Sequence, residues 1–390
     1  MLNKFLLILF GLICCSTFST YLSLKLGIPF GFPELLSLLF LPFFYKDYIL
    51  FFNKIKKRLI TIIFLTTFLL ALGLLSAKSD AYGLFATFRA YFYLFIFFYY
   101  GYDSHYININ SIFLICIGAV LGTEINRVLV SQINSDDLSY ANSLAFVIVV
   151  SYPILRKKYL LSIILISACI YFSFMTSLRR LILELLISIV LTILIIFFKK
   201  GIFKKNKFLL MIVALIFYSF NLVLNYFENI LYNYNYFLWS RVFLKTRDIT
   251  TNRGLGSRIN HLDTGNFLSY IIDTIFPRGL YPRGYPFKVN SSGGSTLDFP
   301  LYEVFYIFGS LTTIIFLSII LRKIIIFLFV IKNNSSKFNE IVLSIVVVLT
   351  SILMLFFDGS ILQYTFVVPF TGLFLGRIFY HKTQNRKITT

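Results

Sequence analysis

Apolar runs long enough to cross a membrane as helices recur along this chain, separated by short polar turns. A helix needs about 20 predominantly apolar residues to span the hydrocarbon core of a bilayer. Apolar residues make up 58% of the chain and charged residues only 13%. A soluble domain of this length needs more polar surface, whereas lipid replaces water around an integral membrane protein. The sequence therefore predicts an all-α polytopic membrane protein.

The apolar runs predict twelve transmembrane helices, at residues 3–24, 29–51, 59–77, 84–100, 111–130, 140–155, 158–175, 180–198, 208–225, 300–321, 340–357 and 360–378. Arg322 and Lys323 interrupt the apolar stretch 314–331, so we expect the tenth span to end there and an interfacial helix to follow. The N-terminus resembles a signal peptide. Because eleven further spans follow, we expect it to remain as the first helix.

Basic residues concentrate in alternate loops, which sets the orientation through the positive-inside rule. With the N-terminus inside, the inner segments hold Lys46, Lys54, Lys56, Lys57, Arg58, Arg156, Lys157, Lys158, Lys199, Lys200, Lys204, Lys205, Lys207, Arg322, Lys323, Lys332, Lys337 and a basic tail from Arg377 to Lys387. Both termini are therefore expected to be cytoplasmic. This orientation accounts for much of the net charge of +20. Because the charges sit in separate loops, no nucleic-acid partner is expected.

A long polar break, residues 225–299, divides the chain into spans one to nine (1–224) and the last three spans with a basic tail (300–390). In the predicted orientation this break is a large loop on the outer side of the membrane. It carries eight basic residues and one histidine against five acidic residues: Arg241, Lys245, Arg247, Arg253, Arg258, Arg278, Arg283, Lys288 and His261 against Glu228, Asp248, Asp263, Asp273 and Asp298. The excess of arginine predicts an anionic ligand.

Inside this loop, apolar residues recur at approximate helical spacing between residues 256 and 276: Ile259, Leu262, Phe267, Ile271 and Ile275. This pattern predicts an amphipathic helix that lies on the membrane and ends at Pro277. Arg258 and His261 would lie one turn apart on it. A turn-rich segment (278–284) follows, and Asp298 and Glu303 stand at the mouth of the tenth span.

Charged residues near span ends are further candidates, because charge within a membrane is costly and marks function. Arg127 shares a helix face with Glu124, and Arg180 with Glu184, so these pairs could be local ion pairs. Two more polar residues open spans: Asn142 and Arg179. The alternative is that the arginines bind phosphate, whose oxygens match the planar guanidinium fork.

The four cysteines, Cys14, Cys15, Cys116 and Cys169, fall inside predicted spans, without disulfide or metal-ligand spacing. No metal or other cofactor is therefore expected.

Taken together, these marks resemble the O-antigen and capsule repeat-unit polymerases (Wzy type), which are related to the O-antigen ligases. The resemblance runs from about residue 120 onward as short motifs in order: Arg127 then Asn142, Ser177 to Arg180, Arg258, the turn from Pro277 to Gly284, and Asp298 to Gly309. Ligases place a His-Asn pair where this chain has Asp298-Phe299, which favours a polymerase. The turn also departs from the family pattern, because Arg278 and Arg283 interrupt it.

The resemblance implies a donor glycan on undecaprenyl diphosphate and an acceptor hydroxyl on a second lipid-linked repeat unit. A diphosphate leaving group needs stabilisation of negative charge, and the candidate ligands are Arg127, Arg179, Arg180, Arg258, Arg278 and Arg283, with Asn142 as a substrate-binding residue. His261, with an unperturbed pKa of about 6.5, is the candidate general base, and Asp298 and Glu303 are its rivals. His261 could equally be a simple polar residue of the loop helix.

Other functions fit parts of the pattern. A ligase that moves finished glycan onto the lipid A core would share the fold and the arginines. A lipid-linked oligosaccharide flippase would have a similar number of spans but no need of the large loop. A secondary transporter and a purely structural membrane protein are the remaining alternatives. The resemblance further implies a bacterial inner membrane, in which the large loop is periplasmic, with membrane lipid and a chain-length regulator protein as partners.

Overall fold

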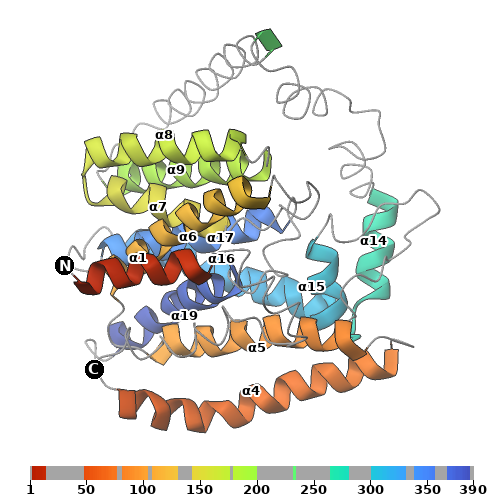
Figure 1. Cartoon of the computed structure of the whole chain (residues 1–390). Coiled ribbons are helices and arrows are strands. Elements are labelled where there is room, and N and C mark those ends of the chain that lie inside the picture. Colours follow the sequence, from red (N-terminus) through yellow and green to blue (C-terminus); the bar gives the residue numbers. More distant parts are fainter. Residues whose placement is uncertain are drawn as a thin grey trace.

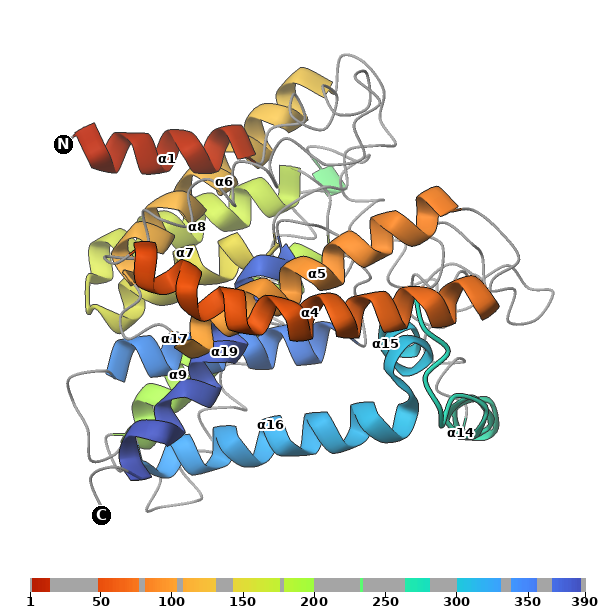
Figure 2. The same ribbon diagram turned by 90° about the horizontal axis from the view of Figure 1, so that it is seen from below.

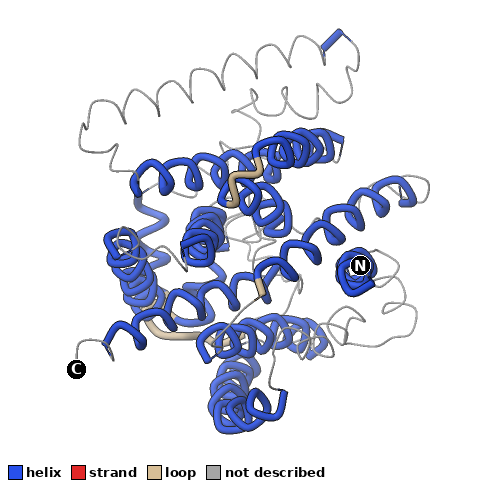
Figure 3. Tube along the Cα trace, turned by 90° about the vertical axis from the view of Figure 1, so that its left-hand side faces the viewer, coloured by secondary structure: helices blue, strands red, loops and turns tan. Residues whose placement is uncertain are grey.

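A computed structural model describes residues 2–14, 48–76, 81–103, 108–130, 143–175, 179–199, 232–233, 264–280, 300–330, 338–355 and 367–386. Within these ranges the chain is helical with short connections, as Figure 3 shows in blue and tan. The named helices are α1 (Leu2–Cys14), α4 (Tyr48–Ser76), α5 (Ala81–Asp103), α6 (Ile109–Val130), α7 (Ser143–Leu155), α8 (Tyr159–Met175), α9 (Arg179–Lys199), α14 (Thr264–Asp273), α15 (Pro300–Phe308), α16 (Ser310–Val330), α17 (Phe338–Met354) and α19 (Val367–Arg386). The all-α prediction is confirmed for this part of the chain. The predicted span 208–225 and most of 29–51 lie outside it.

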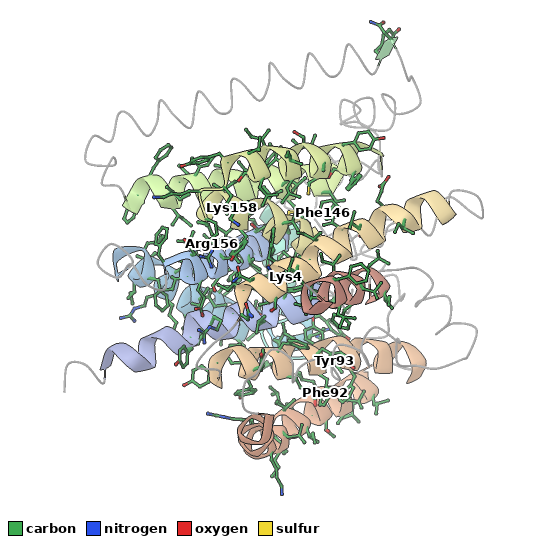
Figure 4. All side chains as sticks on the ribbon, turned by 60° about the vertical axis from the view of Figure 1, so that its left-hand side comes forward. Lys4, Phe92, Tyr93, Phe146, Arg156 and Lys158 are labelled. Carbon is green, nitrogen blue, oxygen red and sulfur yellow. The ribbon has the colours of Figure 1, made fainter. Side chains whose placement is uncertain are left out.

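The helices form a bundle in which each packs against the next through a continuous series of contacts (Figure 1). The series runs from α8 and α9 through α7, α17, α19 and α5 to α4, while α1 pairs with α6. Near the middle, α7 is buried on every side from Leu144 to Val150. Phe146 of this run lies within the bundle in Figure 4. A helix that is apolar all round occupies the core of a large bundle or lies within a membrane.

Glycines let two pairs of helices approach closely. On α19, a Cβ added at Gly376 would collide with the carbonyl oxygen of Phe98 on α5, and one at Gly372 would lie 2.5 Å from the carbonyl oxygen of Leu94. On α1 and α6, Gly11 and Gly118 are blocked in the same way by the facing backbone. Small residues spaced four apart are typical of helix interfaces in membranes, where van der Waals packing drives association.

Among the described residues, two helices are long and apolar enough to cross a membrane by length and composition: Arg58–Leu75 in α4 and Ser310–Leu328 in α16 (Figure 2). Seven further helices are apolar but shorter within the described ranges. The apolar helices are compatible with membrane insertion.

The predicted tenth span was wrong in its limits. Residues 300–321 are two helices, because Gly309 adopts a left-handed backbone (φ 84°) that ends α15 and turns the chain into α16. Helix α16 then continues through Arg322 and Lys323 to Val330, so these residues do not mark its end. The ammonium nitrogen of Lys323 lies 3.7 Å from the centre of the Phe379 ring, a cation–π contact that stabilises the charge on the helix.

Two basic segments also differ from prediction. The inner loop expected from Lys54 to Arg58 is helical and belongs to α4, since lysine and arginine are good helix formers. Arg377, predicted as the first residue of the basic cytoplasmic tail, is buried on α19 and bonds to Glu340, in the first turn of α17. The Tyr380 ring, 4.6 Å away, covers its guanidinium.

The basic turn between α7 and α8 agrees with prediction in one respect. Arg156, Lys157 and Lys158 are all exposed there, and Figure 4 labels the first and last of them.

The loop helix and the termini lie at opposite ends of the bundle. In Figures 1 and 2, α1 begins and α19 ends at one end, whereas α14 and α15 lie at the other, with α14 running across the direction of the long helices. Helix α14 begins at Thr264 and ends at Asp273, earlier than the predicted limit at Pro277, because a turn follows it.

Candidate active site

The candidate site is built by α15 and by residues 274–280, which follow α14 and are called the strap below. The strap is fixed at its start to the beginning of α16. The Ser310 amide donates to the carbonyl oxygen of Thr274 at 2.7 Å, and the Ser310 hydroxyl donates to that of Ile271, also at 2.7 Å. The end of α14 therefore has a defined position beside the α15–α16 junction.

Arg278 is held on the strap by its backbone and by its side chain. Its amide donates to the carbonyl oxygen of Tyr306 on α15 at 2.9 Å. Its Nη2 donates to the carbonyl oxygen of Asp273 at 2.6 Å, and its guanidinium carbon lies 5.9 Å from the centre of the Tyr306 ring. Because the side chain is exposed, its planar fork can be reached from outside the bundle.

The strap continues onto α4. Gly279 takes a left-handed backbone (φ 82°), which glycine adopts without steric cost. The next amide, of Leu280, donates to the carbonyl oxygen of Leu69 on α4 at 3.0 Å. The Leu280 side chain is buried in a small apolar cluster with Leu69, Tyr91 and Ile307.

Glu303 lies in the first turn of α15 and is only 4% exposed. The Tyr91 hydroxyl, on α5, points to its Oε1 at 3.5 Å. The Tyr91 ring packs edge-on against Phe308, with ring centres 5.2 Å apart. Tyr306 follows Glu303 by three residues, so both occupy one face of α15. Arg278 therefore contacts α15 one helical turn from the carboxylate.

The structure gives side-chain surroundings for two of the predicted site residues, Arg278 and Glu303. It describes the backbone of three more, which places Arg127 near the end of α6 and Arg179 and Arg180 at the start of α9. The remaining predicted site residues lie outside the described ranges: Asn142, Arg258, His261, Arg283 and Asp298. Their roles stay predictions.

Helices α6 to α9 run alternately up and down the bundle. Phe113, near the start of α6, packs against Tyr152, near the end of α7, with ring centres 4.9 Å apart. The two helices are therefore antiparallel, so the end of α6 lies beside the start of α7. A tight turn joins α7 to α8, which places the end of α8 and the start of α9 at that same end. Arg127, Arg179 and Arg180 thus belong to one end of this group of helices.

The predicted ion pairs Glu124–Arg127 and Glu184–Arg180 stay untested, because the structure describes the side chains of the two glutamates but only the backbone of the two arginines. Glu184 is fully buried on α9, and Glu124 is half-buried on α6. A buried carboxylate needs a cation or hydrogen-bond donors around it.

Sequence reasoning missed three residues of the site. Tyr91 belongs to a run of aromatic residues in a predicted span, where nothing distinguishes it from its neighbours. Tyr306 also lies among aromatic residues of a predicted span, so nothing in the sequence sets it apart. Gly73 of α4, which the strap crosses, is far from the strap in sequence, so no local pattern could connect them.

Within the described part of the chain, no group of three His, Cys, Asp or Glu residues could hold a metal ion. No protein-family model, curated protein or solved structure matches this chain.

Proposed function

We propose that this chain is a membrane-embedded glycosyltransferase that polymerises lipid-linked oligosaccharide repeat units at the periplasmic face. One observation carries the proposal. An exposed arginine, Arg278, is fixed over Tyr306, one helical turn from the buried carboxylate of Glu303, at the end of an apolar bundle that lies opposite its termini. This is a suitable place for an anionic group on a lipid-linked substrate.

Exposed apolar faces support the membrane location. The outward side chains of α4, α8 and α16 include Phe64 (73% exposed), Leu160 (76%) and Leu311 (56%). Contiguous apolar surface of this kind is rare on soluble monomers and marks contact with lipid or a partner. On α14, Leu268, Ile272 and the following Phe276 are exposed at spacings of four. An apolar stripe on a helix that crosses the bundle end suits a helix lying in the membrane interface.

The donor's leaving group would be undecaprenyl diphosphate. Breaking the glycosidic bond to that diphosphate moves negative charge onto its oxygens, and preorganised cations lower the barrier by stabilising this charge. Arg278 is suited to this task because its guanidinium presents a planar set of donors to phosphate oxygens. We propose that Arg127, Arg179, Arg180, Arg258 and Arg283 complete the set.

The acceptor hydroxyl needs a base that touches it. Glu303 is only 4% exposed and its Oε1 faces the Tyr91 hydroxyl, so an acceptor hydroxyl does not reach it in this arrangement. His261 and Asp298 remain candidates for the general base. Glu303 has a second candidate role, in which its negative charge orients neighbouring groups. We propose His261 as the base, with the carboxylates as alternatives to be distinguished by mutation.

Glycolipid analysis of a deletion strain tests the proposal. Loss of a polymerase leaves lipid A core capped with one repeat unit, and plasmid-borne wild-type protein should restore the long chains. Uncapped core in the deletion strain would instead identify a ligase. Accumulation of the lipid-linked unit on the cytoplasmic side would identify a flippase and overturn the proposal.

A further inference from the structure

We infer that Gly73, on α4, is a positioning residue for Arg278, although the two are far apart in sequence. The inference rests on the role proposed above for Arg278 as a ligand of the diphosphate. The backbones of the strap and of α4 are in direct contact. The strap crosses α4 where Gly73 and Gly279 meet, and neither position leaves room for a side chain.

The contact requires glycine on both sides. A Cβ at Gly73 would collide with the carbonyl oxygen of Leu280. A Cβ at Gly279 would collide with the Gly73 amide nitrogen and lie 2.5 Å from the carbonyl oxygen of Leu69. These obstacles are backbone atoms, which cannot swing aside as a flexible side chain can. Gly279 is also in the left-handed region, where any other residue is strained.

Hydrogen bonds on either side of the contact fix the strap against both neighbours. The Arg278 amide is bonded to Tyr306 of α15, and the Leu280 amide is bonded to Leu69 of α4, at 2.9 and 3.0 Å. The buried Leu280 side chain adds an apolar anchor. The Cα of Arg278 is therefore held between two helices that are separate in the sequence, and the guanidinium starts from a fixed point.

A side chain at position 73 would lift the strap from α4 and carry Arg278 with it. Groups that stabilise charge in a reaction act over short distances, so displacement by about 1 Å is enough to weaken them strongly. Gly73 touches no substrate in this scheme. It acts through the place that it gives to Arg278.

The first measurement reports the docking of the strap without using activity. In full-length protein in membrane vesicles, a Leu280→Cys thiol should be protected from a hydrophilic maleimide, because position 280 is buried. Adding Gly73→Ala should raise its labelling rate on the order of tenfold, as expected for a locally opened segment. Ala71→Val is the matched control, since it adds bulk to α4 at an exposed position. Protein without the new cysteine gives the background from the natural thiols.

Labelling that stays slow in Gly73→Ala, or that rises equally in Ala71→Val, would overturn the inference. If Gly73→Ala fails to accumulate, Gly279→Ala tests the same backbone contact from the strap instead of from α4. It should raise the labelling rate of the Leu280→Cys thiol in the same way, and slow labelling in this variant would overturn the inference.

The second measurement uses inorganic pyrophosphate as the probe with detergent-purified full-length protein. Arg278→Ala and Gly73→Ala should each weaken binding about tenfold, and the double variant should be little worse than either, because both act on one contact. Weakening by Arg278→Ala without any by Gly73→Ala would overturn the positioning role. If Arg278→Ala itself binds normally, the proposed function of Arg278 fails, while the labelling result still decides whether the strap docks on Gly73.

Discussion

The hydroxyl of Tyr91 on α5 lies 3.5 Å from Oε1 of Glu303 on α15. Both residues are almost fully buried, and the tyrosine shares a small apolar cluster with Leu280 of the strap. A carboxylate in such surroundings is stabilised by each donor that points to it. The pair therefore connects the buried acid of the site to α5 of the helical bundle.

Tyr91→Phe should lower polymer formation while leaving the protein folded, if Glu303 contributes to the reaction. The phenyl ring keeps the edge-on contact with Phe308, and only the hydroxyl is lost. At 3.5 Å the hydrogen bond to the carboxylate is long and therefore weak, so its removal should cost roughly two- to tenfold. Long-chain glycolipid resolved on gels measures the effect, and Tyr93→Phe, a second buried tyrosine of α5, is the control. Equal effects of both changes would contradict a specific role for Tyr91.

Arg278→Ala should nearly abolish long chains while the protein still inserts in the membrane, because one charged donor set to the diphosphate is lost. A charged hydrogen bond contributes about 1.5–3 kcal/mol, a rate loss of roughly 10- to 100-fold. Arg278→Lys should recover part of the activity, since lysine offers a point charge instead of a fork. Arg322→Ala, at an exposed arginine on α16, should keep normal chain lengths. Normal chains in Arg278→Ala would remove this arginine from the proposed site.

Topology is testable with two exposed positions at opposite ends of the bundle, Asp273 and Lys158. In intact cells, a membrane-impermeant maleimide should label Asp273→Cys, because the loop is expected to be periplasmic. Lys158→Cys should be labelled only after the inner membrane is opened. The reverse pattern would place the candidate site in the cytoplasm and remove the basis for a periplasmic reaction.

The ion pair between Arg377, which is buried, and Glu340, which is 13% exposed, should stabilise the packing of α19 against α17. A fully buried charge left without its partner typically costs about 3–5 kcal/mol, and the partly exposed carboxylate left by removing Arg377 should cost less. Arg377→Met alone should therefore lower the thermal unfolding temperature of the purified protein clearly. Adding Glu340→Gln should recover part of the loss, because it neutralises the charge that was left. A double variant that is as unstable as the sum of the single variants would show that the two residues act independently.

The contact between α5 and α19 should be sensitive to a single methyl group. Gly376→Ala places a Cβ against the carbonyl oxygen of Phe98, and overpacking of this kind costs about 1–3 kcal/mol. Thermal unfolding in detergent measures it. Ser167→Thr adds one carbon on an exposed part of α8 and should have little effect. Equal stability of the two variants would mean that the helices separate more easily than the structure implies.

Where one apolar run forms one helix, the run by itself predicts the limits of the helix closely. The limits of α6, α8 and α9 differ from the predicted spans by one or two residues. The predicted limits of the tenth span were wrong because the charges of Arg322 and Lys323 were taken as its end. Its real boundary is Gly309, whose left-handed backbone ends α15. Arg322 and Lys323 could stay inside α16 because Phe379, from another helix, covers the lysine.

The sequence by itself determined the helical class, the apolar segments and the arginine-rich loop, because these depend on composition and on periodicity along one segment. It also singled out Arg278 and Glu303. Only the tertiary structure decided that the strap docks on Gly73, that Tyr91 faces Glu303, and that Arg377 is buried against Glu340. Each of these relationships joins residues from different helices. Their contacts exist only once the helices have packed, so no local pattern of residues can encode them separately.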